Sequence, residues 1–127
     1  MAEFGGLILV VDDEPVILRL TSSVLSAAGF GVLVAEDAVA ALACFGEELD
    51  RILLVIADLV MPNLGGIEMV RRMKEVNPSV RVLFMSGYSE SADDAESRQG
   101  FPFIRKPFLP EDLVRKVYEI IGGPLVS

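Results

Sequence analysis

The 127-residue chain carries 11 basic and 19 acidic residues, giving a formal net charge of −8, and 52% of its residues are hydrophobic. This length and balance are typical of one globular domain, and the negative charge disfavours binding to nucleic acids and anionic membranes. The single cysteine, Cys44, excludes an internal disulfide, and the absence of histidine excludes histidine-based catalysis and histidine metal ligation. No apolar run approaches the ~18 residues of a membrane-spanning helix, so we expect a cytoplasmic domain.

Five short apolar runs recur along the chain, with room for a helix after each. They are residues 7–11, 32–35, 52–57, 80–85 and 101–104. Four of them are almost continuously apolar and rich in Val, Ile and Leu, the pattern of strands buried on both faces of a parallel sheet. Pro102 cannot donate a ladder hydrogen bond, which favours an edge position for the fifth strand.

The segments that follow these runs predict helices over residues 15–28, 37–47, 66–76 and 110–121. On the first, a stripe of Ile17, Leu20, Val24 and Ala28 is expected to face the core; on the second, Val39, Leu42 and Phe45. The segment 89–100 contains no apolar residue larger than alanine, which predicts only a short helix around residues 91–97. The alternation predicts an α/β fold with a doubly wound, five-stranded parallel sheet.

Polar residues follow four of the predicted strands directly. Asp12 and Asp13 follow the first, Asp58 the third, Ser86 the fourth and Lys106 the fifth. The carboxyl ends of parallel strands share one edge, where such folds bind their ligands. Taken singly, each residue has an ordinary reading as a helix cap, a turn residue or a solvated lysine.

Taken together, these residues indicate phosphoryl chemistry. Three converging carboxylates repel one another unless a cation neutralises them, and oxygen ligands without histidine or thiolate favour Mg²⁺. Lys106 adds a fixed positive charge and Ser86 a hydroxyl donor. Such a set suits a carboxylate that accepts a phosphoryl group and forms an aspartyl phosphate.

The motifs VVDDEP (residues 10–15), DLVMP (58–62) with GG (65–66), MSGY (85–88) and KPF (106–108) occur in this order. In combination they resemble the receiver domain of bacterial two-component response regulators, which has a flavodoxin-like (βα)5 fold. The resemblance spans residues 7–121, so the whole chain, 1–127, is expected to be a single receiver domain. The sequence at residues 84–89 and 105–108 is also similar to that of receivers at the C-terminus of hybrid sensor histidine kinases.

The resemblance implies a role for each site residue. Asp58 is the phosphoacceptor, and Asp12, Asp13, Asp58 and the backbone carbonyl of Val60 hold Mg²⁺. Lys106 pairs with the phosphoryl group across a cis peptide bond to Pro107, and Ser86 and Phe103 are the switch hydroxyl and switch aromatic. The implied partners are a sensor histidine kinase or its phosphohistidine domain, and a downstream protein.

Other function classes compete with this reading. A pseudo-receiver, acting as a constitutive interaction module, would not require the acids, the serine and the lysine together. An aspartate-nucleophile phosphatase usually needs a second acid two residues after the nucleophile, where this chain has Val60. A flavin carrier needs a hydroxyl- and glycine-rich phosphate loop after the first strand, which here reads Asp-Asp-Glu-Pro. We therefore expect a signalling domain rather than a turnover enzyme, whose output passes through a partner or a longer parent chain.

Overall fold

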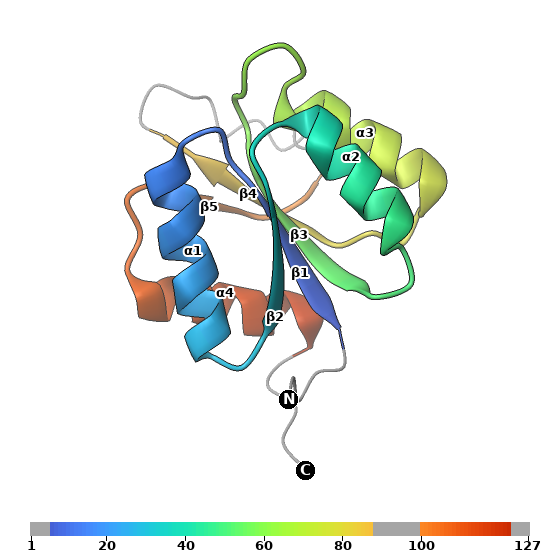
Figure 1. The fold of residues 1–127 in the computed structure, drawn as a ribbon. Coiled ribbons are helices and arrows are strands. Elements are labelled where there is room, and N and C mark those ends of the chain that lie inside the picture. Colours follow the sequence, from blue (N-terminus) through green and yellow to red (C-terminus); the bar gives the residue numbers. More distant parts are fainter. Residues whose placement is uncertain (1–5, 88–99, 123–127) are drawn as a thin grey trace.

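A five-stranded parallel sheet forms the centre of the molecule (Figure 1). This computed structural model describes residues 6–87 and 100–122, so the short helix predicted around residues 91–97 lies outside the described residues. The strands are β1 (Leu7–Val11), β2 (Gly31–Ala35), β3 (Ile52–Asp58), β4 (Val82–Ser86) and β5 (Phe103–Arg105). Their order in the sheet is β2-β1-β3-β4-β5, so β2 and β5 are the edge strands.

Helices cover both faces of this sheet. They are α1 (Pro15–Ala27), α2 (Ala38–Glu47), α3 (Gly66–Val76) and α4 (Pro110–Ile121). The buried side chains form two clusters: one joins the sheet to α2 and α3, and the other joins it to α1 and α4. This is the doubly wound α/β arrangement that the alternating pattern predicts, and the fold prediction is confirmed.

Local sequence signals explain where the helices begin and end. Pro15 and Pro110 occupy the first turns of α1 and α4, where a missing N–H costs nothing. Asp37 caps α2, its carboxylate accepting a hydrogen bond from the Ala40 amide at 2.8 Å. Helix α4 ends at Gly122, whose φ of 96° is left-handed. The carboxyl ends of β1, β3, β4 and β5 lie at the same edge of the sheet because these strands are parallel.

The buried helix faces match the predicted stripes in part. Ile17 and Val24 of α1, its C-cap residue Ala28, and Leu42 of α2 pack against the core as predicted. In α1 the buried residues are Leu18, Thr21 and Leu25, while Leu20 is 46% exposed. In α2 the small residues Ala38 and Ala41 face the core with Phe45, and Val39 is 74% exposed. Helix α2 is apolar almost all round, and the polar residues of α1 are mostly small hydroxyl side chains, so hydrophobicity alone does not identify the buried stripe.

Two strands also differ from expectation. Strand β2 is an edge strand, and Val34 is 52% exposed, so its apolar run does not mean burial on both faces. Strand β5 covers residues 103–105 rather than the predicted 101–104, because its pairing with β4 begins at Phe103. Pro102 still contributes its carbonyl, which accepts a hydrogen bond from the Phe84 amide at 3.0 Å.

Gly66 lets the start of α3 pack against the end of β3. A Cβ at this position would overlap the backbone carbonyl of Asp58. We expect Gly66→Ala to lower the free energy of unfolding by about 3 kcal/mol, because backbone rather than a flexible side chain must move. Gly46, in α2, is the matched control: a Cβ there meets nothing within 4 Å, so Gly46→Ala should stabilise slightly. Urea unfolding measures both; equal effects would contradict this packing argument.

Candidate functional site

Four adjacent strands bring the polar residues together. Asp12 follows β1, Asp58 is the last residue of β3, Ser86 is the last residue of β4, and Lys106 follows β5. The Lys106 amide donates to the Ser86 carbonyl at 2.8 Å, which extends the β4–β5 ladder to the site. The site is therefore built at the carboxyl edge of the sheet, where the strands hold it rigidly.

The Lys106 ammonium lies among three carboxylates. Its Nζ is 3.0 Å from Asp12 Oδ2, 3.2 Å from Asp58 Oδ2 and 3.5 Å from Glu14 Oε1. The Asp12 side chain is fully buried and the side chains of Asp58 and Lys106 are 5% and 13% exposed, whereas the Glu14 side chain is 63% exposed. We call these four residues the carboxylate–lysine cluster.

Backbone amides orient the two buried carboxylates. Asp12 Oδ1 accepts a hydrogen bond from the Glu14 amide at 2.9 Å, and Asp58 Oδ1 accepts a long one from the Val60 amide at 3.4 Å. Both amides lie two residues beyond the carboxylate, in the loops that leave the sheet edge. Each aspartate thus turns its other oxygen, Oδ2, toward Lys106.

Burial and mutual repulsion disfavour ionisation of the aspartates. Burial raises the pKa of Asp58 from 3.8 to about 6; the charge on Lys106 opposes this rise and the charge on Asp12 adds to it. Burial also raises the pKa of Asp12, against the opposing effect of its hydrogen bonds. For Lys106, burial favours the neutral amine, but the aspartates outweigh it and raise the lysine pKa. The cluster holds more negative charge than Lys106 neutralises.

This donor set fits a divalent cation with hard oxygen ligands. Asp12, Glu14 and Asp58 each offer a carboxylate oxygen, and these oxygens lie within 4.8 Å of one another. Within the described residues, the buried Asp12 Oδ2 receives no hydrogen bond of good geometry, although Lys106 lies close to it. A buried carboxylate oxygen without a well-directed hydrogen bond, beside two further carboxylates, matches the preferences of Mg²⁺.

The metal ligands predicted from the sequence are only partly in this cluster. Asp12 and Asp58 belong to it, whereas Asp13 is exposed and not a member. Val60 lies two residues after Asp58, with its side chain 58% exposed. Glu14 was not among the predicted site residues. The signal for it was the acidic run after β1, but the run does not show which of its members turns inward.

Ser86 and the cis peptide bond lie beside the cluster, and Phe103 opens the strand that leads to Lys106. Ser86 is fully buried, and its hydroxyl donates to the Gly87 carbonyl at 3.2 Å. Phe103 opens β5 and is half-buried, with the Arg105 guanidinium 5.8 Å from its ring centroid. The Lys106–Pro107 peptide bond is cis, the geometry that the resemblance implies.

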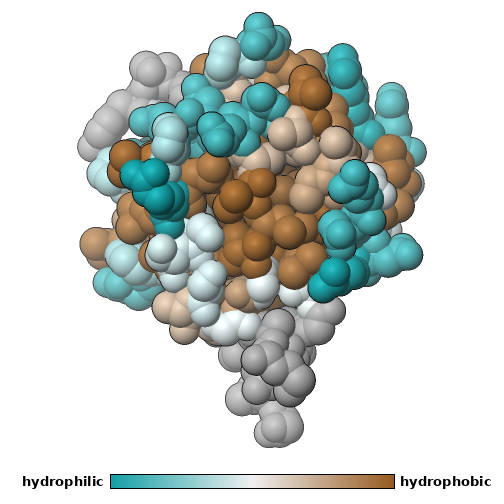
Figure 2. All heavy atoms as spheres, viewed as in Figure 1, coloured by the Kyte–Doolittle hydropathy of each residue, from teal (hydrophilic) through white to brown (hydrophobic). Residues whose placement is uncertain are grey.

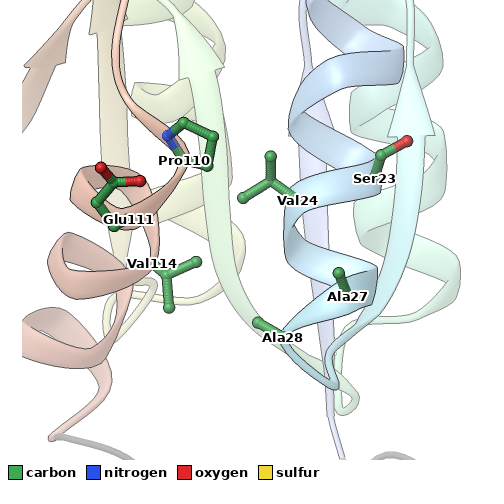
Figure 3. Close-up of a pocket in the computed structure, with 7 residues that line it drawn as sticks. All are labelled: Ser23, Val24, Ala27, Ala28, Pro110, Glu111 and Val114. Atoms are coloured by element: carbon green, nitrogen blue, oxygen red, sulfur yellow. The ribbon is translucent and has the colours of Figure 1, made fainter.

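An apolar groove of the described surface lies away from this site. It has a volume of about 530 Å³ and lies between α1 and α4 (Figure 3). Its lining is mostly apolar, with one carboxylate at its rim: Ser23, Val24, Ala27, Ala28, Pro110, Glu111 and Val114. The groove contains no member of the carboxylate–lysine cluster.

Comparison with known families identifies the class of protein. The family model for the response regulator receiver domain matches residues 8–118. The chain therefore belongs to the response regulator receiver family of two-component signalling, a family of signalling domains. In the part of the chain that the structure describes, no helix is long and apolar enough to cross a membrane.

Individual relatives include both short and long proteins. The chain is 29% identical over 116 residues to the response regulator receiver protein CpdR of Brucella abortus, covering 90% of this chain and 95% of CpdR. It is 29% identical to the sensor kinase CckA of the same organism, covering 90% of this chain but only 12% of the kinase. Several other curated relatives are also covered over less than half of their length.

Solved structures agree with the fold. A response regulator receiver domain protein from Clostridium thermocellum superimposes with a TM-score of 0.84 at 32% identity, covering 92% of this chain and 94% of that one. The receiver domain of NtrX from Brucella abortus gives 0.82 at 31% identity, covering 92% and 99%.

Proposed function

We propose that Asp58 accepts a phosphoryl group from a phosphohistidine, in a reaction that requires Mg²⁺. The observation that carries this proposal is the position of Lys106 Nζ, 3.2 Å from Asp58 Oδ2 and 3.0 Å from Asp12 Oδ2. A fixed cation beside a strand-end carboxylate is placed to stabilise charge on a transferring phosphoryl group. The same arrangement serves no purpose in a constitutive interaction module, which is the alternative function.

In the proposed reaction, an ionised Asp58 oxygen attacks the phosphorus atom. An oxygen–phosphorus bond forms, the bond from phosphorus to the imidazole nitrogen breaks, and its electron pair returns to the departing imidazole. Lys106 is placed to pair with an oxygen of the transferred group, as it now pairs with Asp58. The buried carboxylate of Asp12 keeps Lys106 charged and in position.

Mg²⁺ has a defined place in this proposal. Asp12, Asp58, Asp13 and the Val60 carbonyl are the ligands that the family resemblance implies, and Glu14 is a further acid at the cluster. When bound, the ion would neutralise the excess carboxylate charge and the charge of the phosphoryl oxygens. Its removal by a chelator is expected to abolish phosphorylation.

The signalling consequence follows from Ser86 and Phe103. We propose that phosphorylation draws the Ser86 hydroxyl from Gly87 toward the phosphoryl group and that Phe103 follows inward, which changes the surface at β5. The partners would be a cytoplasmic sensor histidine kinase, or its phosphohistidine domain, and a downstream protein that reads the surface. A place at the C-terminus of a hybrid kinase is one setting for this chain.

The test is phosphorylation by a small donor. Incubation with acetyl phosphate and Mg²⁺ is expected to add the mass of one phosphoryl group to the intact protein, with no addition in Asp58→Ala or after chelation. Asp50→Asn, an exposed aspartate before the opposite end of β3, is the matched control and should be modified like the wild type. Failure of the wild type to react with any donor would favour the interaction module.

A further inference from the structure

A surface with few charges covers the β2 edge of the sheet. Residues 15–47, which include α1, β2 and α2, contain four charged side chains, Arg19, Glu36, Asp37 and Glu47, although 24% of the chain is charged. Figure 2 shows hydrophobic residues gathered at the centre of this side, over β2 and the adjoining flanks of α1 and α2. Val34, on β2 itself, is 52% exposed. We call this the β2 face.

The strand at the centre of this face has an open edge. In the part of the chain that the structure describes, β2 pairs with β1 alone. An edge strand directs alternate N–H and C=O groups outward, and natural proteins usually block such an edge with charges, proline or a bulge. The strand Gly31–Ala35 contains no charge and no proline, and its register with β1 is regular. The edge can therefore accept another strand.

The sequence of β2 specifies which strand fits. This sequence is nearly symmetric about Leu33. Val32 and Val34 flank this residue, and the small residues Gly31 and Ala35 lie beyond them. In a two-fold interface, if residue i of one copy faces residue j of the other, then residue j of the first copy faces residue i of the second, so residues equally distant from Leu33 must fit one another. We propose that β2 pairs antiparallel with β2 of a second copy of this chain, joining two sheets into one.

Charge favours a second copy over a charged partner. Residues 15–47 carry one basic and three acidic side chains, a net charge of −2, so most of the net charge of −8 lies elsewhere in the chain. Two copies therefore repel least when they meet through this face, and a highly charged partner would find few counter-charges here.

The side chains around β2 leave room for such a pair. Val34 lines a groove of about 240 Å³ together with Leu18, Arg19, Ser22 and Ser23 of α1. Antiparallel pairing places Val34 of each copy opposite Val32 of the other and brings the two α1 helices onto the same face of the joined sheet. Serines on this side of α1 allow a close approach. A five-residue strand pair is small, so we expect a weak, concentration-dependent dimer.

Sedimentation equilibrium without Mg²⁺ or phosphodonor tests this pairing independently of the proposed phosphorylation. The average mass of the wild type should rise from 13.7 kDa toward twice that value between low micromolar and several hundred micromolar protein. Val34→Lys, which places a charge on the edge strand, should remain monomeric. Val76→Lys is the matched control, because Val76 is similarly exposed, at 57%, but lies on α3; it should dimerise like the wild type.

A second measurement does not depend on a variant that must fold. Hydrogen exchange on the wild type should show slower exchange of β2 amides at high than at low protein concentration. A wild type that stays monomeric at every concentration would overturn the proposal. So would a folded Val34→Lys variant that dimerises as well as Val76→Lys, or protection that appears elsewhere and not in β2.

Discussion

Replacing Lys106 with methionine is expected to lower the free energy of unfolding by about 3 kcal/mol at pH 8 in the absence of Mg²⁺. The substitution keeps an apolar chain of similar length but leaves the buried carboxylates of Asp12 and Asp58 without the cation that contacts both. Uncompensated buried charge is among the most destabilising changes in proteins. This decrease in the free energy of unfolding should be smaller at low pH, where the aspartates become neutral. Urea unfolding at several pH values measures it.

Two comparisons make the Lys106 prediction specific. Lys116→Met, on α4 and outside the carboxylate–lysine cluster, should change stability little. Mg²⁺ should restore part of the stability of Lys106→Met, because a divalent cation replaces the missing positive charge among the carboxylates. A loss that is equal at pH 4 and pH 8 would mean that Lys106 stabilises the fold through packing rather than charge.

Asp58→Asn is expected to be more stable than the wild type at neutral pH without Mg²⁺. Burial raises the pKa of Asp58 to about 6 from 3.8, so the folded protein holds this proton more tightly than the unfolded chain does. The resulting stability is present below about pH 4 and is lost as the pH rises through about 6. Asparagine has no proton to lose, so the advantage of the variant should grow by up to about 3 kcal/mol between about pH 4 and pH 7.

Urea unfolding of wild type and Asp58→Asn across this pH range gives the difference directly. If the free energies of unfolding of the two proteins changed in parallel with pH, ionisation of Asp58 would not destabilise the fold. Mg²⁺ should narrow the difference at neutral pH, because an ion that binds only the folded wild type adds about 2.7 kcal/mol at 100 times its Kd. An equal response of the variant to Mg²⁺ would place the ion elsewhere.

The sequence predicts the sheet and the meeting of Asp12, Asp58 and Lys106, because parallel strands bring their carboxyl ends to one edge whatever the details of packing. It predicts the buried faces of α1 and α2 only in part. Helix α2 is apolar almost all round, α1 mixes apolar with small hydroxyl residues, and only the packed structure selects Thr21 over Leu20. Nor does an apolar run show that β2 lies at an edge, because strand order is set by the crossovers and not by composition.

For a similar reason, the sequence does not predict that Glu14 belongs to the carboxylate–lysine cluster. Asp13 and Glu14 both follow β1, but Glu14 is the N-cap residue of α1, with extended backbone angles of −95° and 111°. Its side chain reaches Lys106 while that of Asp13 faces solvent. Which of two neighbouring acids turns inward depends on these loop dihedral angles, which the acidic run itself does not encode.

The most direct test of the central proposal is to locate the phosphoryl group chemically. After reaction with acetyl phosphate and Mg²⁺, borohydride reduces an aspartyl phosphate to homoserine, which peptide mass spectrometry assigns to a position. We predict homoserine at position 58 and at no other aspartate, and none when Lys106 is replaced by methionine or Mg²⁺ is chelated. Homoserine at another aspartate, or a stable phosphoryl adduct that borohydride does not convert, would contradict the role of Asp58 as phosphoacceptor.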